Sequence, residues 1–175
     1  MTPPSRIVVA ARLSLVLAVA LTFQLSIAPR VVLFGVQGDL MLLVAIAAGL
    51  VAGPDRGATV AFVAGLAYDL NLQTPFGLSA LTYALVAYLV GLLQDSVLRS
   101  AWWIPVTTAV AASVAGVILY GMFGTVVGED LVSVALVRIA LVVGLLNAIA
   151  APLVVRVMSW AMGSPERARV RAVYR

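Results

Sequence analysis

Residues 38–81, GDLMLLVAIAAGLVAGPDRGATVAFVAGLAYDLNLQTPFGLSAL, decide the fold of this chain. They contain two apolar stretches, residues 39–53 and 57–72, which are joined by the sequence Gly-Pro-Asp-Arg-Gly. Proline and glycine together mark a tight turn at this junction. A second turn, which contains Pro75 and Gly77, leads into a third apolar stretch. The region therefore predicts a close antiparallel pair of short helices that is followed by another helix.

The same apolar character extends through the whole chain. Of its 175 residues, 63% are hydrophobic and only 10% are charged, too few to form the polar surface of a soluble domain. A helix needs about 20 apolar residues to cross a hydrocarbon core about 30 Å thick. The sequence thus predicts an all-α integral membrane protein with six transmembrane helices in one compact bundle, residues 1–161. We expect the spans at residues 7–28, 39–53, 57–72, 78–98, 101–127 and 131–160.

Composition narrows the chemistry that this chain can perform. It has no cysteine and no histidine, which excludes disulfides, thiolate nucleophiles, imidazole bases and the usual zinc ligands. No serine lies in a Gly-x-Ser-x-Gly nucleophile motif. We therefore expect no enzyme activity, no metal site and no cofactor. Nucleic-acid binding is not expected either, because the arginines lie at segment ends instead of forming a stripe with interleaved aromatic residues.

The distribution of arginine predicts the orientation in the membrane. If the N-terminus is cytoplasmic, nine of the eleven basic residues fall on the inner side, and only Arg30 and Arg138 fall on the outer side. Cytoplasmic loops of membrane proteins carry an excess of basic residues, so both termini are predicted to be cytoplasmic. Residues 162–175 then form a basic cytoplasmic tail, which we expect to lie against anionic membrane lipids. Pro152 should kink the sixth span.

Small residues recur at a spacing of four along the second and third spans. Helices in lipid associate through such residues, because small side chains let the two backbones approach closely. The two rows could meet across the turn between the spans. The residues expected to pack in this way are Ala45, Gly49, Gly53, Gly57, Ala61 and Gly65.

Charged side chains at membrane depth are costly and are therefore candidates for a function. Asp39 begins the second span and Asp69 lies near the end of the third, both towards the predicted outer side. Arg138 lies in the sixth span near the same side and could pair with either aspartate, which would lower the cost of burying them. Asp39 could instead cap its own helix, since a carboxylate accepts the free backbone N–H groups of a first turn. Both interpretations remain open from the sequence.

The order and spacing of these residues resemble the MreD family of bacterial rod shape-determining membrane proteins. The resemblance rests on Gly38-Asp39-Leu40, on the stretch from Gly53-Pro54 to Gly65, on Asp69-Leu70, and on Thr74-Pro75-Phe76-Gly77-Leu78. The chain length, the six expected spans and the short basic tail also fit that family.

The resemblance implies a noncatalytic role in the bacterial cytoplasmic membrane. Members of the family that the chain resembles act with MreC, beside the RodA glycosyltransferase and its class B penicillin-binding partner. MreB lies on the cytoplasmic side of this assembly. The implied function is a membrane scaffold of the cell-elongation (rod) machinery that supports peptidoglycan synthesis and cell shape. Asp39, Asp69, Pro75 and Gly77 match the family pattern at the predicted outer end, whereas Arg138 comes only from the charge-pairing argument. The Pro75 to Gly77 turn could present a rigid surface there, because proline fixes φ and glycine permits a positive one.

A second hypothesis comes from overall shape. The resembled family is similar in shape to the substrate-binding subunits of energy-coupling-factor vitamin transporters, which also have six membrane helices. Such a subunit needs a pocket near the outer side, lined by several polar and aromatic groups. The candidates for such a pocket are Gln24, Gln37, Tyr68, Asn71 and Tyr83.

Overall fold

The computed structural model describes residues 5–72, 75–93, 104–128 and 134–163. Within these ranges the chain forms six α-helices, each overlapping one of the expected spans. They are α1 (Arg6–Ser26), α2 (Leu40–Ala52), α3 (Pro54–Asp69), α4 (Leu78–Leu92), α6 (Ile104–Val126) and α7 (Val134–Met162). Thr74, residues 94–98, 101–103 and 131–133 of the expected spans, and the basic tail from residue 164 lie outside the described residues.

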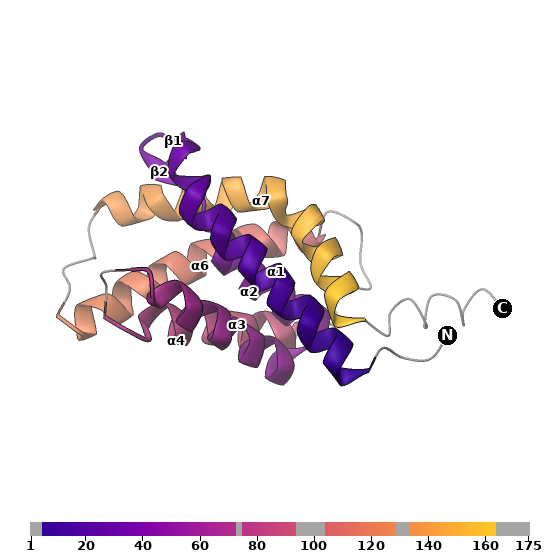
Figure 1. The fold of residues 1–175 in the computed structure, drawn as a ribbon. Coiled ribbons are helices and arrows are strands. Elements are labelled where there is room, and N and C mark those ends of the chain that lie inside the picture. The colour runs from indigo at the N-terminus through magenta and orange to yellow at the C-terminus, as the bar shows by residue number, and fades with distance from the viewer. Residues whose placement is uncertain (1–4, 73–74, 94–103, 129–133, 164–175) are drawn as a thin grey trace.

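Successive helices run in alternating directions, so the bundle has two distinct ends (Figure 1). One end carries a short β-hairpin after α1, together with the starts of α2, α4 and α7, and we call it the hairpin end. The other carries the connection from α2 to α3, together with the start of α1 and the end of α7, and we call it the turn end. The first and last described helices therefore begin and end at the same end of the bundle.

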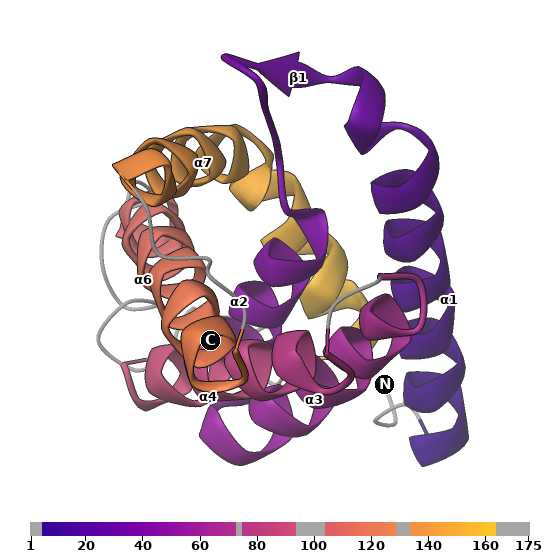
Figure 2. The same ribbon diagram turned by 90° about the vertical axis from the view of Figure 1, so that its left-hand side faces the viewer.

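Helix α2 is the centre of the bundle. Figure 2 shows it enclosed by α1, α3, α4, α6 and α7. Every residue from Met41 to Val51 is buried, so this helix has no polar or lipid-facing stripe. A helix that is apolar on all sides belongs inside a bundle.

The connection between α2 and α3 is shorter than the sequence suggested. The turn was expected to occupy residues 53–57, but Gly53 alone separates the two helices. Gly53 has φ +82° and ψ −177°, a conformation that a side chain would disfavour. Pro54 then starts α3 at the first helical position, where its missing N–H costs nothing, and Asp55 in the first turn suits the helix dipole.

Close backbone contacts hold the short helices together. A Cβ atom added to Gly57 would lie 2.6 Å from the Gly49 Cα, so α2 and α3 touch at these two glycines. Gly49 also faces the Ala87 carbonyl of α4, while Gly65 packs against the Ala80 backbone of α4 rather than against α2. The other members of the two rows, Ala45, Gly53 and Ala61, are buried as well.

The segment between α1 and α2 is not helical. Instead, a 3-10 turn (Ala28–Arg30) leads into strands β1 (Val32–Leu33) and β2 (Val36–Gln37), which pair antiparallel. Phe34 and Gly35, the two residues between the strands, have φ +51° and +79°. Two positive φ values in a two-residue loop suit the right-handed twist of a hairpin, and they stop a helix from forming here.

Three of the described helical segments are long and apolar enough to cross a membrane: Arg6–Arg30, Val106–Val126 and Ala135–Met162. Helices α2 and α4 are apolar but shorter, with 13 and 15 residues. At a rise of 1.5 Å per residue, helices of this length extend over about 20 Å. The structure is thus that of a multi-pass membrane protein, in which the shortest described helix, α2, lies at the centre.

At the turn end, α1 is attached to the last part of α7. The Arg12 guanidinium lies 4.8 Å from the ring centroid of Trp160 and donates a hydrogen bond to the Trp160 carbonyl oxygen at 3.3 Å. Helix α7 bends in its C-terminal half, as expected from Pro152 inside it (Figure 1). The bend brings the end of α7 towards α1.

Candidate functional site

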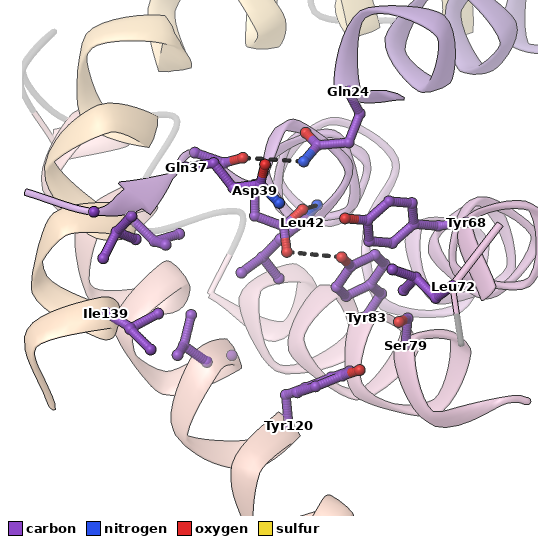
Figure 3. A pocket seen from close by; sticks show the side chains of 16 residues that line it. Gln24, Gln37, Asp39, Leu42, Tyr68, Leu72, Ser79, Tyr83, Tyr120 and Ile139 are labelled. Carbon is purple, nitrogen blue, oxygen red and sulfur yellow. Dashed lines mark hydrogen bonds between the residues drawn. The ribbon is translucent and has the colours of Figure 1, made fainter. Parts of the chain in front are cut away.

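The polar side chains that sequence reasoning selected gather at the hairpin end, around the first turn of α2. Asp39 is the N-cap residue of this helix, and its Oδ1 accepts a hydrogen bond from the Leu42 N–H at 2.8 Å. The capping interpretation of Asp39 is therefore confirmed. The other carboxylate oxygen, Oδ2, accepts a hydrogen bond from the Tyr83 hydroxyl of α4 at 2.7 Å (Figure 3). One carboxylate thus caps α2 and joins it to α4.

Gln24 of α1 completes the start of α2. Its amide nitrogen donates to the Gly38 carbonyl at 3.0 Å, and its amide oxygen accepts from the Leu40 N–H at 2.8 Å. The Gln24 side chain is only 2% exposed, so it replaces water at two backbone groups that would otherwise be buried without partners. A glutamine in an otherwise apolar helix was the sequence signal for this contact.

Asp69 performs a similar task for α4. Its carboxylate accepts hydrogen bonds from three backbone N–H groups: Gly77 at 2.9 Å, and Ser79 and Ala80 at 3.2 Å each. The N-cap residue of α4 is Gly77, which has no side chain to offer. Asp69, the last residue of α3, therefore caps the next helix from outside. The sequence analysis identified the charge of Asp69 but not this capping role. The sequence does contain an indication of it: α4 begins directly after Pro75-Phe76-Gly77, so it has no capping side chain of its own.

The turn before α4 has the geometry that its sequence indicates. Gly77 adopts φ +95° and ψ −7°, the left-handed region that only glycine enters without strain. The Leu78 N–H donates to the Pro75 carbonyl at 3.2 Å. Pro75 and Gly77 thus shape a turn that leaves the Gly77 N–H pointing at Asp69.

The expected ion pair with Arg138 is wrong. Arg138 is exposed on α7, and no salt bridge between it and either aspartate occurs within the described ranges. The physical reason is that Arg138 is exposed, while three backbone N–H groups already hold the Asp69 carboxylate and neutral donors from Leu42 and Tyr83 hold that of Asp39 in place. Backbone amides at a helix N-terminus compete well with an arginine for a buried carboxylate.

A cavity of about 340 Å³ adjoins Asp39 at the hairpin end. Seven polar residues line it: Gln24, Gln37, Asp39, Tyr68, Ser79, Tyr83 and Tyr120. Four of the five residues proposed for a pocket therefore line it, whereas Asn71 is exposed and donates to the Ala67 carbonyl at 3.0 Å instead. Sequence reasoning did not place Ser79 or Tyr120 there. Nothing in the sequence shows that Ser79 of α4 and Tyr120 of α6 line the same cavity.

The rings of Tyr68 and Tyr83 stack beside Asp39, with centroids 6.5 Å apart and an interplanar angle of 15°. Figure 3 shows both hydroxyl groups directed towards the carboxylate side of the cavity. Within the described part of the chain, no group of three or more acidic, histidine or cysteine side chains could hold a metal ion. The arrangement can accept and donate hydrogen bonds in a mostly apolar enclosure.

Comparison with known families assigns the chain. The family described as rod shape-determining protein MreD matches residues 5–161, which is most of the sequence. The chain belongs to the MreD family. The match confirms the resemblance inferred from residues 38–81, and it also covers the expected spans outside that region. Comparisons with curated proteins and with solved structures gave no match.

Membership in the MreD family gives this chain a role in rod shape determination. The family and the long apolar helices together identify a multi-pass membrane protein. Its place within the rod-shape machinery implies protein partners in general.

Proposed function

We propose that this protein is a noncatalytic membrane scaffold of the cell-elongation machinery, which binds MreC and supports peptidoglycan synthesis and cell shape. The observation that carries the proposal is the family match over residues 5–161. RodA and its class B penicillin-binding partner would be neighbours in the same assembly, and MreB would connect indirectly from the cytoplasmic side. No catalytic step is assigned to any residue.

The packing of the bundle supports a scaffold. Its interior is closed by glycine and alanine contacts between α2, α3 and α4, which do not depend on any partner. The outer faces of α1 and α7 carry large exposed apolar side chains, among them Leu15, Val19, Leu141 and Ile149. In lipid such faces can pack against other membrane helices through van der Waals contacts. A rigid core with apolar outer faces suits a protein that holds others in place.

We also propose that all six helices cross the cytoplasmic membrane, with both termini in the cytoplasm and the hairpin end facing outward. The arginine distribution supports this orientation. Asp39, Asp69, Pro75 and Gly77 would then serve at the outer end, where they shape the surface offered to extracytoplasmic partners. Arg138, which is exposed on α7 near that end, is a candidate for direct partner contact.

Single-cysteine labelling tests the orientation, because the natural chain has no cysteine. Phe34→Cys places a thiol in the exposed hairpin loop, and Arg56→Cys places one at the exposed turn end. In intact spheroplasts, a membrane-impermeant maleimide should label the first variant and not the second. Both variants should react after the membrane is permeabilised. The reverse pattern in intact spheroplasts would contradict the proposed orientation.

Purification from the native membrane in mild detergent tests the scaffold role. The tagged chain should recover MreC together with RodA and its class B penicillin-binding partner, identified by mass spectrometry. A tagged six-helix membrane protein of another family, expressed at the same level, is the control. Depletion of the protein should convert rods to round cells, and the wild-type chain should restore the rods. Absence of all three partners from a stable preparation would refute the scaffold proposal.

The alternative function is a substrate-binding subunit of a small-molecule (vitamin) transporter. The cavity at Asp39 is the observation that favours it, since its volume of about 340 Å³ suffices for a small molecule. The same purification separates the two functions. Recovery of ATPase subunits in place of MreC would replace the scaffold with transport.

A further inference from the structure

The cavity at the hairpin end has two unlike walls. The polar wall comes from α1, the segment before α2, α3 and α4, and the opposite wall comes from α6 and α7 and is apolar except for Tyr120. The main apolar members are Val117, Ile139 and Val143, with Gly116 beside them. A volume of about 340 Å³ falls within the usual range of ligand sites, about 300 to 1,000 Å³. The shape is that of a site for a small molecule with one polar and one apolar end.

The polar wall carries a negative charge without a positive partner. Among the described residues that line the cavity, Asp39 is charged and no arginine or lysine is present. The groups that donate to it, the backbone N–H groups of Leu42 and Met41 and the Tyr83 hydroxyl, are all neutral. The negative charge of Asp39 therefore has no positive partner among the described residues that line the cavity. A carboxylate away from water is stabilised by a cation that reaches it.

Ser79 supplies an independent indication of a ligand. Its side chain is 0% exposed, and its Oγ has no hydrogen-bond partner within the part of the chain that the structure describes. Ser79 lies one helical turn before Tyr83 on the cavity face of α4 (Figure 3). Buried hydroxyl groups almost always have a hydrogen-bond partner, so the Ser79 hydroxyl is an exception that needs an explanation. A ligand in the cavity can provide it.

The charge of the lining residues indicates which class of ligand the cavity can bind. An anion would be repelled by Asp39 and would find no basic side chain among the described lining residues. A cation gains from the carboxylate, and the electron-rich rings of Tyr68 and Tyr83 favour a positive charge nearby. An ammonium group adds N–H donors, which suit the carboxylate and the Ser79 hydroxyl. We propose that this cavity binds a small organic amine in its ammonium form, with the ammonium group at Asp39 and the apolar part against α6 and α7.

Three probes of similar size but different charge test the proposal: 2-phenylethylammonium, 2-phenylethanol and phenylacetate. The readout is the unfolding temperature of the purified full chain in detergent, because a ligand that binds only the folded state raises it in a saturable way. The ammonium probe should stabilise the wild-type protein. The alcohol and the carboxylate should not do so to the same extent. An equal response to the alcohol would refute recognition through Asp39.

Matched variants separate binding from partitioning into the detergent micelle. Asp39→Asn keeps an N-cap oxygen for α2 and removes the charge, so it should weaken the ammonium probe at least about tenfold. Ser79→Ala removes only the hydroxyl and should also weaken binding, which a merely structural serine would not do. Asn71→Ala, at the same end but outside the cavity, should bind like the wild type. Unchanged binding in Ser79→Ala and Asp39→Asn would overturn the proposal.

Ser79→Ala keeps the test decisive even if Asp39→Asn does not fold, because it shortens one buried side chain without disturbing a bond. Native mass spectrometry of the same preparation provides a second measurement. A phospholipid bound at one copy per chain and not displaced by the ammonium probe would also overturn the proposal. The experiment uses the isolated chain, so its outcome is independent of whether MreC or RodA is recovered as a partner.

Discussion

Asp69 should be important for the stability of the described bundle. Asp69→Ala removes the acceptor for three backbone N–H groups at the start of α4, at a site only 3% exposed. A hydrogen bond to a charged group contributes about 1.5–3 kcal/mol, and loss of an N-cap alone costs about 0.5–2 kcal/mol. Two of the three bonds are long, and all share one carboxylate, so the terms do not add fully. We expect a loss of about 3–4 kcal/mol in the free energy of unfolding.

Asp69→Asn provides an intermediate case. If the amide oxygen takes the place of Oδ2, it keeps the bonds from Gly77 and Ala80, and only the bond from Ser79 is lost. The expected cost is about 1–2 kcal/mol. Asp55→Ala is the control, because this exposed acid in the first turn of α3 interacts mainly with the helix dipole, worth about 0.3–1 kcal/mol. Equilibrium unfolding in mixed micelles with increasing dodecyl sulfate, followed by tryptophan fluorescence, measures the series.

Two results would refute the capping role of Asp69. One is an Asp69→Ala variant within about 1 kcal/mol of the wild type, which is the range of the surface control. The other is rescue of Asp69→Arg by Arg138→Asp, because exchanged charges restore stability only where the two side chains pair. We expect no rescue, since Arg138 is exposed and the carboxylate is bound by N–H groups.

Three further predictions concern the packing and the helix ends. Gly57→Ala puts a Cβ 2.6 Å from the α2 backbone and should lower the free energy of unfolding by about 1–3 kcal/mol or more. Gly38→Ala is the control: its Cβ meets only side-chain atoms at 3.6 Å, so the same assay should show a far smaller loss. Gln24→Ala frees two buried backbone groups at the start of α2 and should cost about 1–3 kcal/mol per group; retention of wild-type stability would mean that water replaces the amide. Arg12→Ala removes the ring contact and the hydrogen bond to Trp160, so α1 should become more susceptible to protease at the turn end, although stability falls by only about 0.5–1 kcal/mol.

Much of this fold could be predicted from local chemistry. Apolar stretches of the right length predict helices wherever the bilayer is the solvent, and all six appear at the expected positions. Gly53-Pro54 predicts a sharp reversal because one residue accepts a positive φ and the next starts a helix without its N–H. An aspartate at the start of an apolar run predicts a cap, as found for Asp39. In each case the deciding interaction lies within a few residues along the chain.

The remaining features depend on contacts between distant segments. A buried carboxylate can be paired with a guanidinium or with backbone N–H groups. An arginine is visible in the sequence, whereas almost every residue has a backbone N–H, so the sequence does not show which of these groups will be free to bind. This is why Asp69 was paired with Arg138 when its real partners are eight to eleven residues ahead. The cavity is a stronger case, because it exists only where α1, α4, α6 and α7 bring unrelated positions together. Ser79 gains its significance solely from that convergence.

The short length of α2 explains why the polar groups gather where they do. A helix of 13 residues extends over about 20 Å and cannot reach both faces of a core about 30 Å thick. At the turn end it connects directly to Asp55 and Arg56, which are exposed and belong at the membrane surface. In the proposed membrane placement, its other end then lies about 10 Å below the opposite surface, where lipid cannot satisfy free N–H groups. Asp39 and Gln24 supply those partners from within the protein, and the space left above a helix that ends early becomes the cavity.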